Sequence, residues 1–281
     1  VREKGIRSIY FVSEDSKLAL MLRKFCKSSG FDFRWENPVS AEKSKLTARR
    51  VFDSLPAPVQ ALIYCLRHLF KSLPLNRTKN KAVQLLKGDI IFVDILTHLD
   101  RQAFVSGTFI SNYWTALIDM LIRLKIKTNW LHNFFYQKEI PTFSCGQKLL
   151  SGFNSNYNEG QSHALVEANL NLSVFINVLK DYIKTSRFGF RLSAIDRCFK
   201  PAGSDLDFWP LFKDEWVDSL SGKGAITNCL RISLYEAIFN SLSYQRQGIY
   251  IQENQPWEMA LIHAWKSAGH GKLVGVPHTI V

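Results

Sequence analysis

The sequence predicts an α/β fold, a Rossmann-like parallel sheet with helical insertions, and two patterns lead to this prediction. Residues 90–93, Ile-Ile-Phe-Val, are apolar without alternation, which is typical of a parallel strand covered on both faces. Strand and helix patterns also alternate at residues 8–35 and 249–276, as in βαβ units. The 281 residues, 46% of them hydrophobic, suffice for one large core or two modest ones.

The first elements form the start of a βαβ unit. An apolar strand is predicted at residues 8–12 and an amphipathic helix at residues 18–26. Gly30 then stops the helix, and a second strand follows at residues 31–35, since glycine is the residue that most readily ends a helix. Residues 37–87 are predicted to be mainly helical and basic.

The middle of the chain continues this alternation. A buried strand is predicted at residues 89–96, a helix at residues 112–124 and another strand at residues 129–135. Residues 137–163 are polar and rich in Gly and Asn, which predicts a mobile loop or lid. Apolar residues then recur at helical spacing from Leu165 to Ile183.

The last elements complete the predicted sheet. Residues 189–224 are predicted to be irregular, and they are followed by a helix at 228–242, a strand at 249–252, a helix at 256–267 and a strand at 273–276. The predicted organisation is therefore a Rossmann-like domain made of residues 1–136 and 248–281. Residues 137–247 would form a mainly helical insertion with a mobile polar loop.

The net charge of +12 is concentrated in the first third of the chain. Residues 1–90 hold 18 Lys and Arg against 8 Asp and Glu, which leaves a net +10 there. The excess is densest between Asp53 and Asp89, where no acid interrupts six basic residues. The basic region 43–87 therefore predicts contact with an anionic surface, either lipid headgroups or nucleic acid. A solvated basic face without a partner is the alternative.

Cysteine usage and apolar runs restrict the class of protein. The five cysteines are odd in number and form no CxxC pair, so neither a disulfide framework nor a zinc knuckle is indicated, and a cytoplasmic setting fits. No apolar run reaches the roughly 18 residues of a membrane span. The chain begins with Val1 and ends in an apolar run at Val281, which predicts a fragment of a longer protein.

Polar side chains follow the predicted strands at their carboxyl ends, where open parallel sheets bind ligands. The tips in question belong to the strands ending near residues 12, 96, 135, 252 and 276. They carry Ser13, Glu14 and Asp15; Asp94 and His98; His132; Glu253 and Asn254; and His278. Each residue alone is weak evidence for a function. Their shared position at one edge of the predicted sheet, however, predicts a ligand-binding site there.

The most specific segment is Glu253-Asn254-Gln255-Pro256-Trp257-Glu258, where a buried strand gives way to a helix. Pro256 suits the first helical position, and Glu258 can reach back to a free backbone N–H as in a capping box. Helix initiation does not explain Glu253, whose carboxylate could hold a sugar hydroxyl or act as a general base. The helix N-terminus beside it could hold a phosphate or a carboxylate.

Two further segments suggest contacts to a sugar. Asn112, Tyr113 and Trp114 follow the Asp94 and His98 tip, and an aromatic ring beside an amide suits a sugar ring and its hydroxyls, although Trp114 also fits a core position. His132 lies in an aromatic-rich strand, where a buried, hydrogen-bonded histidine is the alternative. No nucleotide-binding glycine loop, GxSxG or HExxH motif is present, and no metal-ligand spacing indicates a metal.

The run YIQENQPWEMALIHAWKSAGHGKLVGVPHT at residues 250–279 resembles a segment of bacterial surface-polysaccharide (O-antigen or capsule) biosynthesis proteins. These proteins are similar to GT-B glycosyltransferases of the 3-deoxy-octulosonate (Kdo) transferase type. The stretches FVDILTHL, SGTFISNYW and TNWLHNFF also look like this group. The resemblance covers residues 90–281 loosely and residues 249–279 well.

The resemblance implies a cytoplasmic enzyme, peripheral to the inner membrane, of which this chain is the N-terminal half of a GT-B architecture. A nucleotide-activated donor, with a CMP-linked sugar as one candidate, would deliver a glycosyl unit to a glycan or lipid-linked acceptor. Glu253, His278 and Asp94 would be catalytic. Substrate would contact Asn254, Glu258, His98, Asn112, Tyr113, Trp114 and His132.

The resemblance also bears on cofactors and partners. It implies no cofactor beyond the donor substrate, and the basic region 43–87 would hold the protein against anionic lipid. Two alternatives of other classes remain, a basic nucleic-acid-binding module and a non-catalytic scaffold of a glycan-assembly complex. Nucleic acid ranks lower because no helix-turn-helix or RRM-like signature is present.

Overall fold

The computed structural model describes residues 7–38, 48–73, 75, 88–156, 160–192, 194–203 and 206–278. The chain divides into two compact units. The first contains residues 1–63 and 182–225, and the second contains residues 64–181 and 226–281. The chain crosses between them within three helices, α3 (Ala57–Ser72), α7 (Leu172–Arg191) and α9 (Lys223–Ser241).

The first unit begins with the predicted βαβ pattern, which is confirmed. Strands β1 (Ser8–Val12) and β2 (Asp32–Glu36) pair in parallel around helix α1 (Ser16–Ser29). Asp15 caps α1 by accepting hydrogen bonds from the backbone N–H groups of Lys17 and Leu18, and the helix ends at Gly30 with φ 74°. These two strands form a sheet of their own.

The rest of the first unit is helical. It contains α2 (Ala48–Asp53), a 3-10 helix at Ile195–Phe199 and α8 (Trp209–Ser221), which packs against α1 and holds it by an ion pair between Lys17 and Asp214. The prediction that residues 189–224 are irregular was therefore wrong for α8. Pro210 lies at the start of that helix, where proline is well tolerated.

The second unit is built on a five-stranded parallel sheet. The strands are β3 (Ile90–Ile95), β4 (Thr128–Asn133), β5 (Gln161–Leu165), β6 (Gln247–Gln252) and β7 (Lys272–Pro277), in the order β5-β4-β3-β6-β7. An α/β fold with a parallel sheet is thus confirmed, and this sheet is compatible with a Rossmann-like fold. Both β3 and β4 are buried along their whole length, as strands covered on both faces should be.

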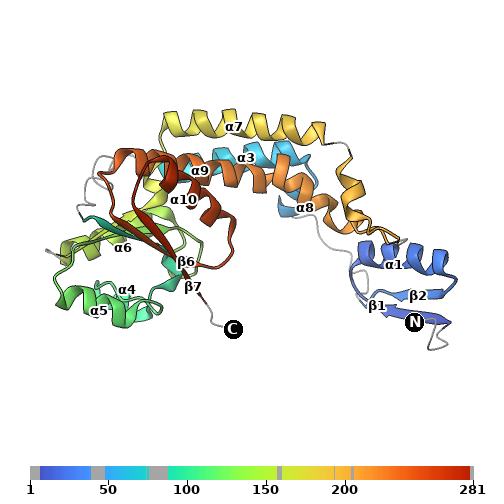
Figure 1. Ribbon diagram of the computed structural model, residues 1–281, viewed down its shortest axis with the longest axis horizontal. Coiled ribbons are helices and arrows are strands. Elements are labelled where there is room, and N and C mark those ends of the chain that lie inside the picture. Colours follow the sequence, from blue (N-terminus) through green and yellow to red (C-terminus); the bar gives the residue numbers. More distant parts are fainter. Residues whose placement is uncertain are drawn as a thin grey trace. The chain divides into compact units, whose positions relative to one another are not determined.

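The strand order reverses direction between β3 and β6. From β3 the chain moves outward to β4 and β5, and from β6 it moves outward to β7 on the other side. Because crossovers between parallel strands are right-handed, these two branches place their helices on opposite faces. Helices α4 (Arg101–Ser106) and α5 (Thr115–Arg123) lie on one face, and α10 (Pro256–Ser267) and α9 lie on the other (Figure 1).

Aromatic packing holds the centre of this unit together. The Trp130 ring is fully buried and stacks on Phe92, with 4.3 Å between ring centroids. The Phe109 ring also packs on Trp130, with 4.6 Å between ring centroids. Large buried rings of this kind contribute strongly to a core, so the sheet is a rigid base for the residues at its edge.

The region between β4 and α7 differs from the sequence prediction. Residues 137–163 were predicted to be a mobile loop, but α6 (Phe143–Asn156) and the start of β5 lie there. The helix predicted from Leu165 begins only at Leu172, after a 3-10 turn at Val166–Asn169. The units also divide the chain elsewhere than the predicted boundaries at 136 and 248, because β5 joins the main sheet and β1 and β2 do not.

No helix in the described part of the chain is both long enough and apolar enough to cross a membrane. Most of the basic region 43–87 outside α2 and α3 falls beyond the described residues.

Candidate functional site

The carboxyl ends of β3 and β6 are neighbours at the point where the strand order reverses. In open α/β sheets this switch point is where ligands bind, because the loops leave on opposite faces and a crevice opens between them. The chain places Asp94 in β3, His98 at the end of the 3-10 turn Leu96–His98 that follows it, and Glu253 directly after β6. His278 follows the neighbouring strand β7.

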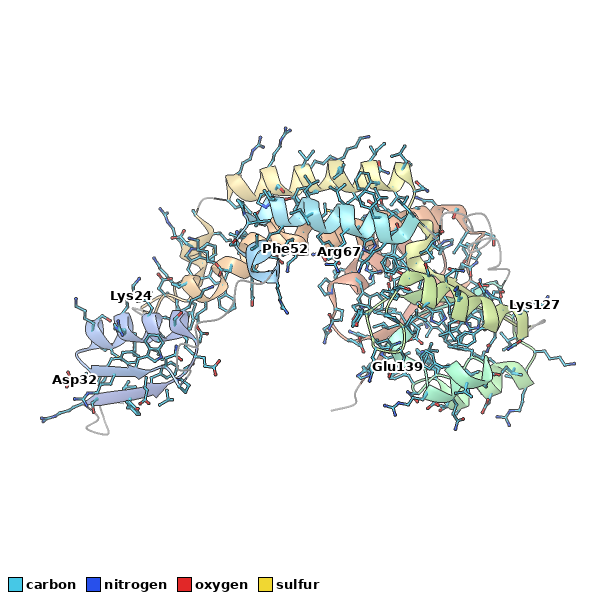
Figure 2. All side chains as sticks on the ribbon, turned by 180° about the vertical axis from the view of Figure 1, so that it is seen from behind. Lys24, Asp32, Phe52, Arg67, Lys127 and Glu139 are labelled. Atoms are coloured by element: carbon cyan, nitrogen blue, oxygen red, sulfur yellow. The ribbon has the colours of Figure 1, made fainter. Side chains whose placement is uncertain are left out.

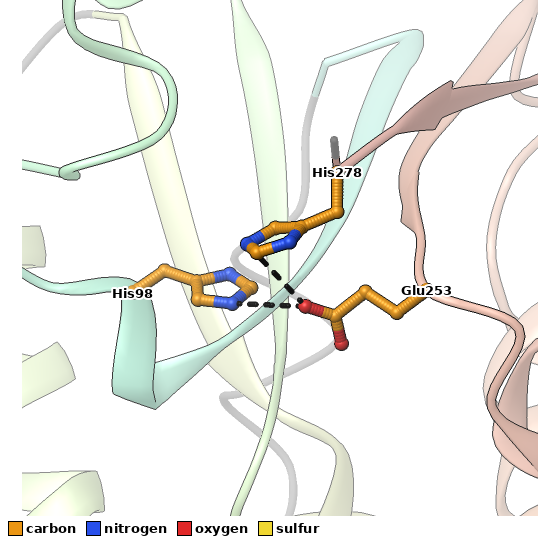
Figure 3. Close-up of side chains that lie close together, drawn as sticks. All are labelled: His98, Glu253 and His278. Carbon is orange, nitrogen blue, oxygen red and sulfur yellow. Dashed lines mark ion pairs between the residues drawn. The ribbon is translucent and has the colours of Figure 1, made fainter. Parts of the chain in front are cut away.

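The fold brings three of these side chains into one group, the His98–Glu253–His278 cluster. His98 Nε2 lies 3.5 Å and His278 Nε2 lies 3.7 Å from the same oxygen, Oε1 of Glu253. Figure 3 shows the two rings facing that carboxylate. The side chains of His98 and Glu253 are 15% and 20% exposed, and that of His278 is 45% exposed, so the cluster is accessible from solvent.

Asp94 orients the His98 ring through a side-chain hydrogen bond. Its side chain is buried, and its Oδ1 lies 2.8 Å from Nδ1 of His98 while also accepting the backbone N–H of Ile95. Burial lowers the pKa of His98, but the hydrogen bond and charge of Asp94 and the charge of Glu253 outweigh it, so that this pKa lies above its ordinary value. The His98 ring is thereby oriented with Nε2 toward Glu253.

Tyr113 forms the aromatic side of the cluster. Its ring stacks on His278 with 5.5 Å between centroids and on His98 with 6.1 Å, and its hydroxyl donates to the carbonyl of Pro277. Burial, followed by the charges of Glu253 and Asp94, raises the pKa of the Tyr113 hydroxyl. The stacked rings fix the direction of His278, which otherwise has an exposed side chain.

The β6–α10 loop shows that the run from Glu253 to Glu258 has two roles. Helix α10 begins at Pro256 after Gln255, as predicted, and Glu258 Oε1 accepts the backbone N–H groups of Glu253 and Gln255, both at 2.8 Å. Asn254 has a left-handed φ of 59°, an uncommon conformation for a residue other than glycine. The loop is held in this shape, with the Glu253 carboxylate in the cluster.

Replacing Glu258 by alanine should lower the free energy of unfolding by about 1 to 3 kcal/mol, because two backbone N–H groups beside a buried side chain would lose their acceptor. Glu258→Gln keeps an acceptor oxygen at this position and should cost clearly less. Urea titrations of both variants measure the difference. Equal destabilisation by Ala and Gln would show that the hydrogen bonds do not hold the loop.

Other predicted site residues lie outside the cluster. Trp114 is 5% exposed and packs on Phe92 in the core, so it does not present a face to a sugar. His132 is fully buried and its Nε2 lies 3.1 Å from Nδ1 of His163, which supports the alternative of a buried histidine over substrate contact. Asn112 holds the turn before α5 by donating to the carbonyl of Leu99. Asp15, at another predicted tip, caps α1.

Sequence reasoning missed a pocket of about 590 Å³ next to the cluster. It lies between α3, the segment after β4, α9 and the first turn of α10, and its lining includes Gln255 and Trp257, so the β6–α10 loop borders both features. We call it the basic aromatic pocket because of the side chains Arg67, Lys71, Arg231, Tyr64, Phe135 and Tyr136. No aspartate or glutamate is among the described residues that line it.

Cationic side chains line the pocket from two helices, α3 and α9. Arg67, labelled in Figure 2, and Lys71 both belong to α3. They are part of the basic region 43–87, for which the sequence predicts contact with an anionic surface. His68 lies between them and is neutral at physiological pH, because burial, with the charges of Arg231 and Lys71, lowers its pKa to about 3. The Trp257 Nε1 is buried without a hydrogen-bond partner among the described residues, which leaves a donor beside the pocket.

A metal ion also has possible ligands at this edge. The three ligand atoms of the His98–Glu253–His278 cluster lie within 4.8 Å of one another. No local sequence pattern indicates this group of ligands, because residues 98, 253 and 278 are far apart in the chain. Only the pairing of β3 with β6 and of β6 with β7 brings them together.

Comparison of this chain with protein-family models, curated proteins and solved structures gives no match. Function therefore has to be inferred from the chemistry of the site.

Proposed function

We propose that this chain is a glycosyltransferase, which moves a sugar from a nucleotide-activated donor to a glycan or lipid-linked acceptor. The observation that supports this best is the basic aromatic pocket, which is lined by the same β6–α10 loop that carries Glu253. It combines cations, aromatic rings and a helix N-terminus, and the described residues that line it include no carboxylate. The five-stranded sheet would then be one Rossmann-like half of a GT-B architecture.

The pocket suits a phosphorylated substrate. Arg67 and Lys71 can pair with phosphate oxygens, and the first turn of α10 adds the positive end of its dipole. Tyr64, Phe135 and Tyr136 offer flat faces for a sugar ring or a base. A lipid-linked phosphate at an anionic membrane surface would use the same cations.

The chemistry of transfer would take place at the cluster. Glu253 is partly exposed and has no hydrogen bond to its side chain shorter than 3.5 Å among the described residues. Its carboxylate can therefore receive the proton of an acceptor hydroxyl as that oxygen attacks the anomeric carbon, while the nucleotide leaves with its phosphate. His98 and His278 would orient the hydroxyl from either side.

The test uses the purified chain with a panel of CMP-, UDP-, GDP- and dTDP-linked sugars and a membrane lipid extract as acceptor. Glu253→Gln should reduce transfer at least about 100-fold, since a general base contributes roughly that much or more. The variant should still bind nucleotide in thermal-shift measurements. Arg67→Ala with Lys71→Ala should instead weaken nucleotide binding.

Glu236→Gln is the matched control, because Glu236 is a half-exposed acid that pairs with His263 at the surface. It should leave transfer and binding unchanged. Transfer by Glu253→Gln at the unaltered rate would remove Glu253 from the mechanism. Absence of any nucleotide-dependent thermal shift, in a chain that is folded by circular dichroism, would count against the proposed substrate class.

A further inference from the structure

The distances from the two histidines to Glu253 in the His98–Glu253–His278 cluster are longer than those of well-formed hydrogen bonds. The two histidine Nε2 atoms lie 3.5 and 3.7 Å from Glu253 Oε1, whereas N–H···O bonds span about 2.7 to 3.2 Å. Two imidazole nitrogens are therefore directed at one carboxylate oxygen (Figure 3), and the three ligand atoms lie within 4.8 Å of one another. A gap of this kind has the size that a bound cation requires.

We propose that this cluster binds one divalent transition-metal ion, with Zn²⁺ the best match. Zinc takes nitrogen and carboxylate ligands at about 2.0 to 2.2 Å in a tetrahedron, which separates neighbouring ligand atoms by roughly 3.4 Å. The distances of 3.5 and 3.7 Å, with all three atoms within 4.8 Å of one another, match that separation after small side-chain rotations. Imidazole ligands favour Zn²⁺ over Mg²⁺ or Ca²⁺, which prefer oxygen.

Asp94 gives the site the support that metal-binding histidines have. Histidine ligands commonly donate their other ring N–H to a carboxylate, which fixes the tautomer and turns the free lone pair toward the metal. Asp94 Oδ1 lies 2.8 Å from His98 Nδ1 on the side away from Glu253, and its side chain is 2% exposed. Nε2 of His98 is thus left as the metal ligand.

The other two ligands are also held in place. Tyr113 stacks on the His278 ring at an angle of 8°, and the backbone N–H of Glu253 is fixed by Glu258. Three protein ligands leave a fourth position of a tetrahedral ion open, as in catalytic zinc sites. The open position faces solvent because His278 is 45% exposed.

The site extends the proposed function but does not rest on it, because its evidence is the ligand geometry alone. An ion held by Oε1 of Glu253 would leave Oε2 of that carboxylate free. A hydroxyl on the open position would be acidified by the ion, and Oε2 could receive its proton. Metal binding and sugar transfer can be measured separately.

The experiment measures Zn²⁺ binding to the full chain, without an affinity tag, after treatment with EDTA. Isothermal titration should give one Zn²⁺ per chain with a Kd in the micromolar range or tighter. His98→Ala and His278→Ala should each weaken binding at least about 10-fold, and Asp94→Asn should weaken it about 10- to 100-fold by misorienting His98. Co²⁺ in place of Zn²⁺ should give the visible absorption of a four- or five-coordinate ion.

His263→Ala is the control, since His263 is an exposed histidine on α10 paired with Glu236, and it should leave the Kd unchanged. Circular dichroism verifies that each variant is folded. Stoichiometric binding that persists in both His98→Ala and His278→Ala, or no binding by the folded parent chain, would overturn the proposal. Zn²⁺ binding without sugar transfer would overturn only the proposed function, and transfer in EDTA without Zn²⁺ binding would overturn only the metal site.

Discussion

Glu167→Ala is expected to lower the free energy of unfolding by about 3 to 5 kcal/mol, the loss typical of a buried ion pair with one partner removed. Arg231 Nη1 lies 2.7 Å from Glu167 Oε1, with the two side chains 11% and 0% exposed. Without Glu167 the hydrogen-bond acceptors left to the buried guanidinium among the described residues would be the Asn133 side-chain oxygen at 3.1 Å and the Phe134 carbonyl at 3.5 Å, neither of them charged. The backbone N–H of Phe134 would also lose its acceptor.

The ion pair between Glu167 and Arg231 leads to a second prediction, which concerns replacing both residues. Burial raises the pKa of Glu167 above its ordinary value, although the charge of Arg231 opposes this. For Arg231 the balance is the reverse, since the charge of Glu167 outweighs burial and raises its pKa. The pair therefore gains little over a pair of apolar side chains of similar volume. Replacing both residues by leucine should therefore cost less than either single alanine substitution. Urea unfolding followed by near-ultraviolet circular dichroism measures all three variants.

An exposed ion pair provides the control. Arg246 and Asp89 lie 3.5 Å apart with side chains 67% and 63% exposed, and Asp89→Ala should change the free energy of unfolding by less than about 1 kcal/mol. A cost below about 1 kcal/mol for Glu167→Ala as well would show that the buried pair has no special weight.

The elements that were predictable from sequence are those whose signals are local. Strand β3 is an unbroken apolar run, and helix α10 has Pro256 at its first position with Glu258 returning to the backbone. Strand β5 gave no such signal, because Gln161, Ser162 and His163 are polar. The position of β5 in the sheet depends on its pairing with β4, which brings His163 into contact with His132. The local sequence around either histidine does not predict this contact.

The candidate site was predictable as a location but not as an arrangement. Open-sheet topology places Asp94, His98, Glu253 and His278 at one edge once β3, β6 and β7 are recognised as parallel strands. Their convergence on one oxygen, Glu253 Oε1, depends on strand order, which the sequence does not encode locally. The basic aromatic pocket was hidden for the same reason, since α3 meets the segment after β4 only in the folded unit.

Two buried histidines should make the stability of the second unit strongly dependent on pH. His132 and His163 are fully buried with parallel rings, and their facing nitrogens lie 3.1 Å apart, a distance that accommodates a single proton. Burial lowers the pKa of His132 to about 4 and that of His163 well below 6.5. Both are therefore neutral in the folded protein at pH 5 to 7, whereas both take up protons when unfolded.

The direction of the effect follows from proton linkage. Between pH 6.5 and about 4 the unfolded chain binds more protons than the folded one. The contribution of the neutral histidines to the free energy of unfolding is therefore complete above pH 6.5, and it is lost as the pH is lowered. Each histidine should account for about 2 kcal/mol between pH 7 and pH 5, and the pair for about 4 kcal/mol. His68 acts in the same sense, and His98, whose pKa is raised, acts in the opposite sense.

His163→Phe isolates this contribution, because phenylalanine keeps an aromatic ring among Phe109 and Phe153 but does not titrate. The quantity to compare is the difference in the free energy of unfolding between pH 7 and pH 5, measured by urea titration at each pH. This difference should be about 2 kcal/mol smaller in the variant than in the parent chain, whatever the stability of the variant at pH 7. Equal differences in the two proteins would mean that His163 already binds a proton in the folded state, which its complete burial without a charged partner argues against.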